Sequence, residues 1–413
     1  MGPYLAVFVT AASITFLFTP LVRRVVIRMG AIDHPSDRKV HPRPTPTMGG
    51  LAMYLGFVVA MALSMFLPYF RDVHAASPEP LAAFVTCTLM VALGVVDDLK
   101  GTRALTKFTA QLFVAGVLVV FGVQLAYFFF PGQGEGNLIG LSSDLAVPLT
   151  ILWTVAIANA VNLVDGLDGL ASGMVAIASV AFFVYMVRSP SLFGDASEAA
   201  LLSVITAGIC IGFLPWNFHP ARIFMGDSGS MLLGMLVAIA TISGIGRNPY
   251  APGAGDWAAI TGPVLVPLLV LFVPLLDVLV AVIRRTRRHQ GIAVADKEHI
   301  HHRLVDVGHG HRQAVLLMYL WSALISGSAL AIGLIDGRLA VGAIVLASMV
   351  LFLVTALPRV AERRRNGDAN GEGGQGAAAS EGATPEPGLG NGSAGKPAHR
   401  YEPYKLGGGD PPS

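Results

Sequence analysis

Long apolar stretches follow one another along most of this chain, and their number limits the folds that the sequence can adopt. About 20 apolar residues in a helix are enough to cross the hydrocarbon core of a bilayer. Because lipid offers no hydrogen-bonding partners, such segments cross it as helices. The stretches lie at roughly residues 4–22, 49–70, 80–96, 107–123, 144–160, 169–187, 200–216, 229–246, 262–283, 313–335 and 338–357. We therefore expect an all-α polytopic membrane protein with about eleven transmembrane helices.

The composition agrees with a membrane protein and excludes other classes. Hydrophobic residues make up 54% of the chain and charged residues 13%, whereas soluble domains carry about 25% charged residues. The net charge of +2 indicates no nucleic-acid-binding surface. Cys87 and Cys210 both lie within apolar stretches, so neither a disulfide framework nor a thiolate metal site is expected.

Basic residues predict the orientation of the chain. The first apolar stretch has no basic residue ahead of it and no small-residue cleavage site, so we interpret it as an anchor. Cytoplasmic loops carry an excess of lysine and arginine. Such residues follow the first, ninth and last stretches, as Arg23, Arg24, Arg28, Arg38, Lys39, Arg43, Arg284, Arg285, Arg287, Arg288, Arg359, Arg363, Arg364 and Arg365. We expect the N-terminus outside and the C-terminus in the cytoplasm, in a plasma or inner membrane.

Composition also divides the chain into two parts. Residues 1–358 contain all the apolar stretches and are expected to form one membrane-embedded domain. Residues 359–413 begin with arginines and then become rich in Gly, Ala, Pro, Glu and Ser without periodicity. Because such a composition cannot form a packed core, we predict a disordered cytoplasmic tail.

In this topology the polar residues of the cytoplasmic side gather in five clusters, whereas the outside loops resemble connectors. The clusters are residues 33–50, residues 97–101, Asn159 to Ala171, Arg222 to Gly229, and His299 to Arg303. Their convergence on one membrane surface predicts a single active site on the cytoplasmic face.

The segment from Asn159 to Ala171 carries amides and carboxylates straight out of an apolar helix. A carboxylate near hydrocarbon is costly, so its presence indicates function. Asn162, Asp165 and Asp168 recur every three residues and are expected to line one helical face that can hold a divalent cation. The alternative is that the amides only join helices by hydrogen bonds.

The cluster around Asp227 also has two interpretations. Residues 226–229, Gly-Asp-Ser-Gly, resemble the nucleophile loop of chymotrypsin-like proteases, but that loop belongs to a β-barrel fold and here it opens a membrane helix. We favour a helix N-terminus whose backbone N–H groups suit phosphate, with Asp227 free to bind Mg²⁺. Asp97 and Asp98 are catalytic candidates, or else solvated residues at the end of a span.

The histidine cluster allows a different class of protein. A cation transporter could use this loop to buffer metal, or its histidines could be surface residues without a role; they are His299, His301, His302, His309 and His311. The neighbouring Lys297 and Arg303 favour phosphate over zinc, because cations oppose metal capture. Transporter sites lie near the bilayer midplane, whereas these clusters lie at the ends of spans.

In their order along the chain, these motifs resemble a known family. They are Asp33-His34-Pro35, Arg38-Lys39-Val40-His41, Pro44-Thr45-Pro46, Gly49-Gly50, Asp97-Asp98, the segment 159–171, Phe224-Met225-Gly226-Asp227 and His299-Ile300-His301-His302-Arg303. They resemble the polyprenyl-phosphate N-acetylhexosamine-1-phosphate transferases, the WecA/TagO-like members of glycosyltransferase family 4. The resemblance covers roughly residues 1–358, which would then form the transferase domain.

The resemblance implies an Mg²⁺-dependent reaction, with Mn²⁺ as an alternative ion. A UDP-N-acetylhexosamine, expected to be UDP-GlcNAc, gives its sugar 1-phosphate to a membrane polyprenyl phosphate and releases UMP. The product starts a cell-envelope polysaccharide, and a homodimer is compatible with the family. Such phosphoryl transfer depends mainly on positioning and charge neutralisation.

The family motifs also imply roles for single residues. Asp227 is the first choice as metal ligand, with Asn162 and Asp165 beside the metal and nucleotide. Asp97 and Asp98 would lie next to the acceptor phosphate as base or orienting groups, and Lys107 would neutralise phosphate. The implied catalytic residues are Asp97, Asp98, Asp165 and Asp227, and the implied substrate-binding residues are Lys107, Asn159, Asn162, Asp168, His299, His301, His302 and Arg303.

A second branch of the family is the runner-up. The phospho-MurNAc-pentapeptide transferases of peptidoglycan synthesis typically carry three consecutive histidines followed by Phe-Glu, and they lack the Asp-x-Pro…Arg-Lys-Val-His segment. Residues 45–50, Thr-Pro-Thr-Met-Gly-Gly, nevertheless resemble that branch, which therefore stays as the alternative.

Overall fold

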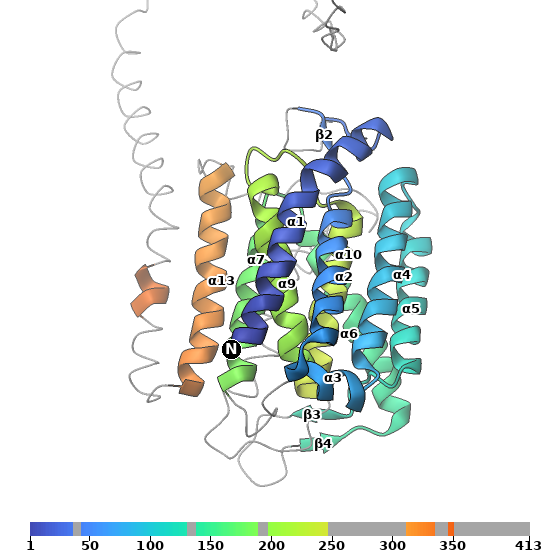
Figure 1. Ribbon diagram of the computed structural model, residues 1–413, viewed down its shortest axis with the longest axis vertical. Coiled ribbons are helices and arrows are strands. Elements are labelled where there is room, and N and C mark those ends of the chain that lie inside the picture. Colours follow the sequence, from blue (N-terminus) through green and yellow to red (C-terminus); the bar gives the residue numbers. More distant parts are fainter. Residues whose placement is uncertain (36–42, 130–137, 189–196, 247–310, 335–345, 351–413) are drawn as a thin grey trace, which may run out of the picture. The chain divides into compact units, whose positions relative to one another are not determined.

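Helices account for most of the regular structure in the computed structural model of the chain (Figure 1). The structure describes residues 1–35, 43–129, 138–188, 197–246, 311–334 and 346–350. The long helices are α1 (Gly2–Arg28), α2 (Gly50–Phe66), α4 (Glu79–Lys100), α5 (Ala104–Val120), α6 (Ser143–Val164), α7 (Leu170–Arg188), α9 (Glu198–Asn217), α10 (Gly226–Thr241) and α13 (His311–Leu334).

Six helical segments of the described residues are long and apolar enough to cross a membrane. They are α1, α4, α6, α7, α9 and the segment from Gly226 to Gly244, and a bent pair that starts with α2 raises the number to seven. The expected all-α polytopic membrane fold is thus confirmed. The count of about eleven spans is not confirmed, since the stretch 262–283 and most of 338–357 lie outside the described residues, and the orientation stays a prediction.

The expected span 49–70 is bent rather than straight. Helix α2 ends at Phe66, and the helical segment Pro68–Ala75 runs at 90° to it. This segment covers the 3-10 turn Pro68–Phe70 and most of α3 (Arg71–Ala76). Proline lacks an N–H and disfavours a helical conformation in the residue before it. Leu67 is accordingly extended, with φ −86° and ψ 120°. The sequence pattern did not predict this bend, because most residues on both sides of it are apolar.

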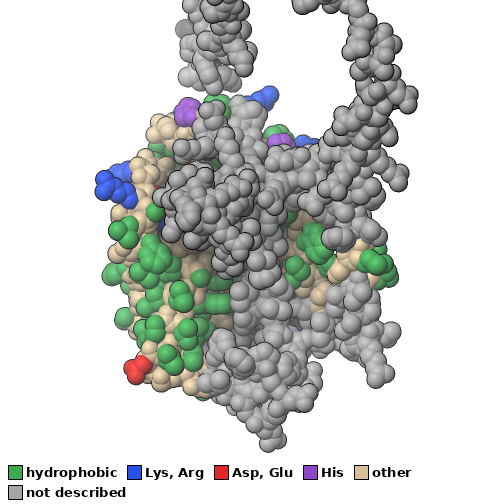
Figure 2. Space-filling model, turned by 180° about the vertical axis from the view of Figure 1, so that it is seen from behind, with side chains coloured by type: hydrophobic (Ala, Val, Ile, Leu, Met, Phe, Trp, Pro, Cys, Tyr) green, Lys and Arg blue, Asp and Glu red, His purple; other side chains and the backbone are tan. Residues whose placement is uncertain are grey.

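Helix α10 lies among the others and brings its first turn into the bundle. It packs against α4, α6, α9 and α2, while α1 packs against α9 and α2. Nearly all of its side chains, including Met231, Leu232 and Leu236, are buried. The outer surface of the bundle is apolar instead, and Figure 2 shows hydrophobic side chains over the middle of the described surface, with Lys and Arg near one end.

Three backbones meet at the start of α10. A Cβ on Gly50 of α2 would collide with the backbone nitrogen of Gly229, and a Cβ on Gly94 of α4 would collide with the backbone of Ser228. Small residues allow membrane helices to approach this closely. The two glycines therefore fix where the first turn of α10 lies, one helical turn away from Asp98 on α4.

Short strands connect the ends of α1 and α10. Strands β1 (Ile32–Asp33) and β2 (Thr45–Pro46) pair antiparallel. The Phe224 N–H donates to the Pro46 carbonyl at 2.8 Å, and the Gly49 N–H donates back to the Phe224 carbonyl at 2.8 Å. These bonds hold the loop before α10 against the segment that follows α1. A second hairpin, β3 (Tyr127–Phe129) and β4 (Leu138–Gly140), precedes α6.

The contact at Gly94 yields a first prediction. Gly94→Val should destabilise the folded protein by about 1–3 kcal/mol, because the added carbons have no space against the α10 backbone. Gly116→Val is the matched control, since Gly116 is also within a helix and nothing lies within 4 Å of its missing Cβ. The thermal unfolding of both variants is monitored in detergent by size-exclusion chromatography. Equal loss in the two variants would contradict the close approach of α4 and α10.

Candidate functional site

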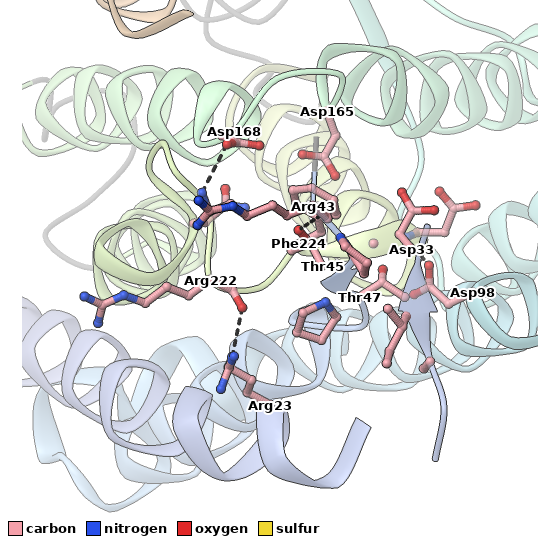
Figure 3. Close-up of a pocket in the computed structure, with 18 of the residues that line it drawn as sticks. Arg23, Asp33, Arg43, Thr45, Thr47, Asp98, Asp165, Asp168, Arg222 and Phe224 are labelled. Carbon is pink, nitrogen blue, oxygen red and sulfur yellow. Dashed lines mark hydrogen bonds between the residues drawn. The ribbon is translucent and has the colours of Figure 1, made fainter. Parts of the chain in front are cut away.

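A cavity of about 1210 Å³ opens among the ends of α1, α4, α6, α9 and α10. Figure 3 shows Arg23 and Arg222 at the end of this cavity away from Asp33 and Asp98. The charged and amide residues that line it are Arg23, Asp33, Arg43, Asp98, Asn162, Asp165, Asp168, Asn217, His219, Arg222, Asp227 and His311. The described residues therefore bring four of the five predicted clusters to one place.

Asp227 is the point at which the side chains from three helices meet. It belongs to the first turn of α10. Its Oδ1 accepts a hydrogen bond from Asn162 Nδ2 of α6 at 2.6 Å. Its Oδ2 pairs with the Lys107 ammonium of α5, which also pairs with Asp97 Oδ2 at 3.0 Å. One cation thus compensates two carboxylates.

The orientation of the Asn162 amide leaves its oxygen available. Nδ2 donates to Asp227 Oδ1 at 2.6 Å and to Ser230 Oγ at 2.8 Å, so both of its hydrogens are used. Within the described part of the chain, no donor reaches Asn162 Oδ1. An amide oxygen held in this way is a suitable ligand for a hard cation.

Asp97 is fixed by the turn that follows α4. Its Oδ1 accepts from the Thr102 backbone N–H at 2.6 Å and also from the Thr102 hydroxyl. Gly101 allows this turn because it adopts φ +64°, in the left-handed region. Asp97 thereby holds Lys107 with one oxygen and the turn with the other.

Asp98 caps helix α10. Its carboxylate oxygens accept from the Asp227 N–H at 2.9 Å and the Ser228 N–H at 3.1 Å. A carboxylate at a helix N-terminus is stabilised by the unpaired N–H groups and by the helix dipole. The interpretation that these N–H groups form a phosphate cradle is corrected by this geometry, because Asp98 already binds two of them.

The expected helical face of Asn162, Asp165 and Asp168 does not form. Helix α6 ends at Val164, and residues 165–169 make a tight loop before α7, in which Gly169 has φ +79°. Glycine accepts this conformation at little cost, so the loop can turn at Gly169 directly into α7. The three residues still line the same cavity, so they are brought together by the loop instead of by helical periodicity.

Asp165 lies in a strongly negative environment. Withdrawal from water, together with the charges of Asp227, Asp98 and Asp168, raises the pKa of Asp165 well above its usual range. Carboxylates that repel one another in this way are stabilised by a shared cation. Asp227, Asp165 and Asn162 line the same cavity and carry oxygen atoms of the kind that could hold Mg²⁺.

Asp168 has a different set of partners. His219 Nδ1 donates to Asp168 Oδ2 at 2.7 Å, and the Ala221 backbone N–H donates to the same oxygen at 3.1 Å. The His311 ring stacks on the His219 ring with centroids 4.2 Å apart. Asp168 therefore joins the loop after α6 to the loop after α9 and lies beside the start of α13.

Sequence reasoning missed three polar residues. Asn217 is 1% exposed and connects both loops, since its Oδ1 accepts from the Gly169 N–H at 3.1 Å and its Nδ2 donates to the Ile223 carbonyl at 3.2 Å. His219 is the second, and Gln111 of α5 is the third, because its Oε1 accepts from Asn159 Nδ2 at 2.7 Å. In the sequence, these residues are marked only as polar side chains within or just after an apolar stretch, which could have indicated a functional role.

Not every predicted residue lines the cavity. Asp97 and Lys107 reach Asp227 from α4 and α5, and Asn159 faces α5, so these three are not part of the cavity wall. The residues His299, His301, His302 and Arg303 lie outside the described residues. Their roles stay predictions.

Comparison with known proteins places these residues in a family context. A sequence model of glycosyl transferase family 4 matches residues 80–245. The chain is 43% identical over 361 residues to the decaprenyl-phosphate N-acetylglucosaminephosphotransferase of Mycolicibacterium smegmatis, with 85% of this chain and 88% of the relative covered. The enzyme of the same description from Mycobacterium tuberculosis is 44% identical over 325 residues, which cover 77% of this chain and 79% of the relative.

A relative of another description is more distant. The phospho-N-acetylmuramoyl-pentapeptide-transferase of Mycolicibacterium smegmatis is 31% identical over 371 residues, which cover 81% of this chain and 97% of the relative. Both kinds of relative thus match most of the chain, and the first kind matches with the higher identity.

The environment of Asp165 predicts how stability depends on pH. Because the folded pKa of Asp165 lies above its unfolded value, the folded state binds more protons, and stability is lost as pH rises through the folded pKa. In chelator, Asp165→Asn should therefore raise the melting temperature at pH 7.5, and its advantage over the natural chain should shrink as the pH is lowered. A pH-independent difference would contradict the charge repulsion. Asp72→Asn, at the exposed start of α3, is the control and should change little.

Proposed function

Since this chain belongs to glycosyl transferase family 4 and is a phosphotransferase of the WecA/TagO-like kind, we propose that it transfers N-acetylglucosamine 1-phosphate from UDP-GlcNAc to a membrane polyprenyl phosphate. UMP is the second product. The lipid-linked sugar starts an envelope polysaccharide, and the reaction takes place at the cytoplasmic face of the plasma membrane.

One observation carries this proposal, namely that the Asp227–Lys107 pair joins a polar cavity to an apolar surface. Asp227 lines the cavity, which suits a water-soluble nucleotide sugar. Lys107 belongs to α5, where the neighbouring Leu105 and Phe108 are 75% and 46% exposed, as is usual for side chains that face lipid. A lipid-anchored phosphate can therefore approach Lys107 from the membrane while the nucleotide occupies the cavity.

The charges of the site match the two substrates. Bound Mg²⁺ would neutralise charge on the donor diphosphate, with Asp227, Asp165 and Asn162 as its protein ligands, and Mn²⁺ is the alternative ion. Arg43 on the cavity wall adds a cation that can contact a phosphate or sugar oxygen. Lys107 neutralises the acceptor phosphate.

The two adjacent aspartates have separate tasks in this proposal. Asp97 orients the Lys107 ammonium, to which it lies at 3.0 Å. Asp98 is a positioning residue, because its hydrogen bonds to the N–H groups of Asp227 and Ser228 fix the first turn of α10. Neither needs to remove a proton from the acceptor, since a phosphate monoester has a second pKa of about 6 and is largely dianionic at neutral pH.

The reaction then proceeds in one displacement. An oxygen of the lipid phosphate attacks the phosphorus that carries the sugar, and the bond from this phosphorus to the bridging oxygen breaks. UMP leaves with the bridging oxygen. An attack by an aspartate would require two displacements between anions instead of one, and both members of the aspartate pair are already hydrogen-bonded within the protein.

The alternative substrate is UDP-MurNAc-pentapeptide. The higher identity to the N-acetylglucosamine enzymes, 43% against 31% to the pentapeptide transferase of the same organism, favours UDP-GlcNAc. Membership of a transferase family argues against the cation transporter. A homodimer stays a prediction.

The purified protein tests this proposal directly. With Mg²⁺ and polyprenyl phosphate, release of UMP should be fastest from UDP-GlcNAc among UDP-GlcNAc, UDP-GalNAc, UDP-glucose and UDP-MurNAc-pentapeptide. Asp227→Asn should lower turnover by at least about 100-fold, because an amide is a much weaker ligand for Mg²⁺ than a carboxylate. Asp72→Asn is the matched control and should retain activity. Faster turnover of the pentapeptide substrate would favour the runner-up branch.

Isotope exchange tests the single displacement. Protein freed of lipid acceptor is mixed with UDP-GlcNAc, Mg²⁺ and labelled UMP. We expect no label in UDP-GlcNAc until polyprenyl phosphate is added, because without the acceptor no phosphoryl group leaves the donor. Rapid exchange in the absence of acceptor would establish a phosphosugar–enzyme intermediate and would make a carboxylate the nucleophile.

A further inference from the structure

Four side chains interlock where α1 meets the end of α9, and two of them, Arg23 and Arg222, line the end of the cavity away from Asp98. The Phe16 and Trp216 rings lie 5.6 Å apart, and Trp216 Nε1 donates to the Phe16 carbonyl at 3.1 Å. The Arg222 guanidinium lies 5.5 Å from the centre of the Trp216 ring. Arg23 Nε donates to the Arg222 carbonyl at 2.9 Å. We call this group the arginine–tryptophan seam.

Within the described ranges, the seam carries positive charge without a carboxylate paired to it. Among the described residues, no carboxylate pairs with Arg23 or Arg222, although both guanidinium groups keep several N–H donors free. The Arg222 side chain is directed away from Asp98 and Asp165 (Figure 3). Helix α1 contains no Asp or Glu that could offset this charge. Its exposed Arg24 and Arg28 add further positive charge.

An apolar strip lies next to the seam on α1. Phe16, Leu17 and Leu21 are 42%, 65% and 51% exposed, and only 22% of the apolar window of this helix is buried within the protein. Arg23 follows Leu21 by two residues. Charged side chains next to exposed apolar ones, with a tryptophan between them, are typical of the region where lipid headgroups begin.

We propose that the arginine–tryptophan seam binds an anionic phospholipid, with the phosphate on Arg23 and Arg222 and the acyl chains along α1. Arginine binds phosphate oxygens with two parallel N–H donors. The cation–π contact keeps the Arg222 guanidinium beside the Trp216 ring, where it can meet a headgroup phosphate. Basic pockets between transmembrane helices bind such headgroups in the same way.

The site is connected to the loop that precedes α10. The Arg222 N–H donates to the Trp216 carbonyl at 2.8 Å, and Phe224, two residues further on, pairs with Pro46. A lipid on Arg222 therefore stabilises the segment that leads to Asp227. The occupant is a resident phospholipid, and neither the donor nor the acceptor of the transferase is part of this inference.

Quenching of Trp216 fluorescence tests the site. The full chain, with Trp153, Trp257 and Trp321 replaced by phenylalanine, is placed in phosphatidylcholine vesicles that contain equal fractions of brominated phosphatidylglycerol or brominated phosphatidylcholine. Attraction to the arginines should enrich the anionic lipid about fivefold at the site, so the brominated phosphatidylglycerol should quench Trp216 more strongly. Equal quenching by the two lipids would overturn the proposal.

Two variants of equal charge separate the seam from general surface charge. Arg222→Gln should abolish the preference for phosphatidylglycerol, whereas Arg24→Gln should keep it, because Arg24 has no contact with Trp216. Equal loss in both variants would reduce the effect to diffuse charge and refute a built site. If the tryptophan replacements lower the yield, native mass spectrometry of the natural chain and these two variants counts retained phosphatidylglycerol and applies the same criterion.

Competition identifies the source of the phosphate. Inorganic phosphate and UDP-GlcNAc should leave the quenching by brominated phosphatidylglycerol unchanged. Displacement by UDP-GlcNAc would assign the two arginines to nucleotide binding, and displacement by polyprenyl phosphate at low mole fraction would assign them to the acceptor. Either outcome would overturn the phospholipid site.

Discussion

The structure depends on how negative charge is compensated at the first turn of α10. Asp227 pairs with Lys107, which also pairs with Asp97, while Asp98 binds the N–H groups of Asp227 and Ser228. Isolated carboxylates near hydrocarbon are costly, so the helices that carry these residues have to assemble around one another. Helices α4, α5, α6 and α10 thus take their places because their polar side chains need partners.

Under the proposed function, the same arrangement lets two substrates of different solubility share a site. Polar groups of Asp227 face the cavity, whereas Lys107 arrives from a helix whose neighbouring side chains are exposed and apolar. A site built only within the cavity would exclude a lipid. A site built only on α5 would lack the polar cavity proposed for the nucleotide sugar. In the proposed reaction, phosphoryl transfer therefore takes place at the ion pair between the two.

Much of the fold could be predicted from the sequence, because apolar length and local polarity are properties of consecutive residues. The helices around the stretches 80–96 and 200–216 appear within a few residues of their expected bounds, as Glu79–Lys100 and Glu198–Asn217. The bend after Phe66 and the end of α6 at Val164 were not expected. The bend depends on the backbone preference of Pro68, and the loop after α6 turns into α7 at Gly169, whose φ is +79°.

In the candidate site, too, local motifs could be predicted from the sequence, whereas contacts between distant segments could not. The order of the motifs indicated Asp97, Asp98, Asn162 and Asp227, and the structure brings them together. It could not indicate that Asp98 caps a helix 129 residues away, or that Asn217 joins two loops, because such contacts arise only when distant segments pack. Periodicity describes one segment at a time, so the partner of a buried polar group has to be found in three dimensions.

The glycine contacts between α4 and α10 have a mechanical consequence. Gly94 brings the α4 backbone against Ser228, and Asp98 lies one turn further along the same helix. With no side chain between the two backbones, there is no compliant layer that could absorb a relative shift. When lateral pressure or a change in bilayer thickness tilts α4, the first turn of α10 moves with it as one body. The spacing between Asp98 and Asp227 is thus insulated from deformation of the surrounding membrane.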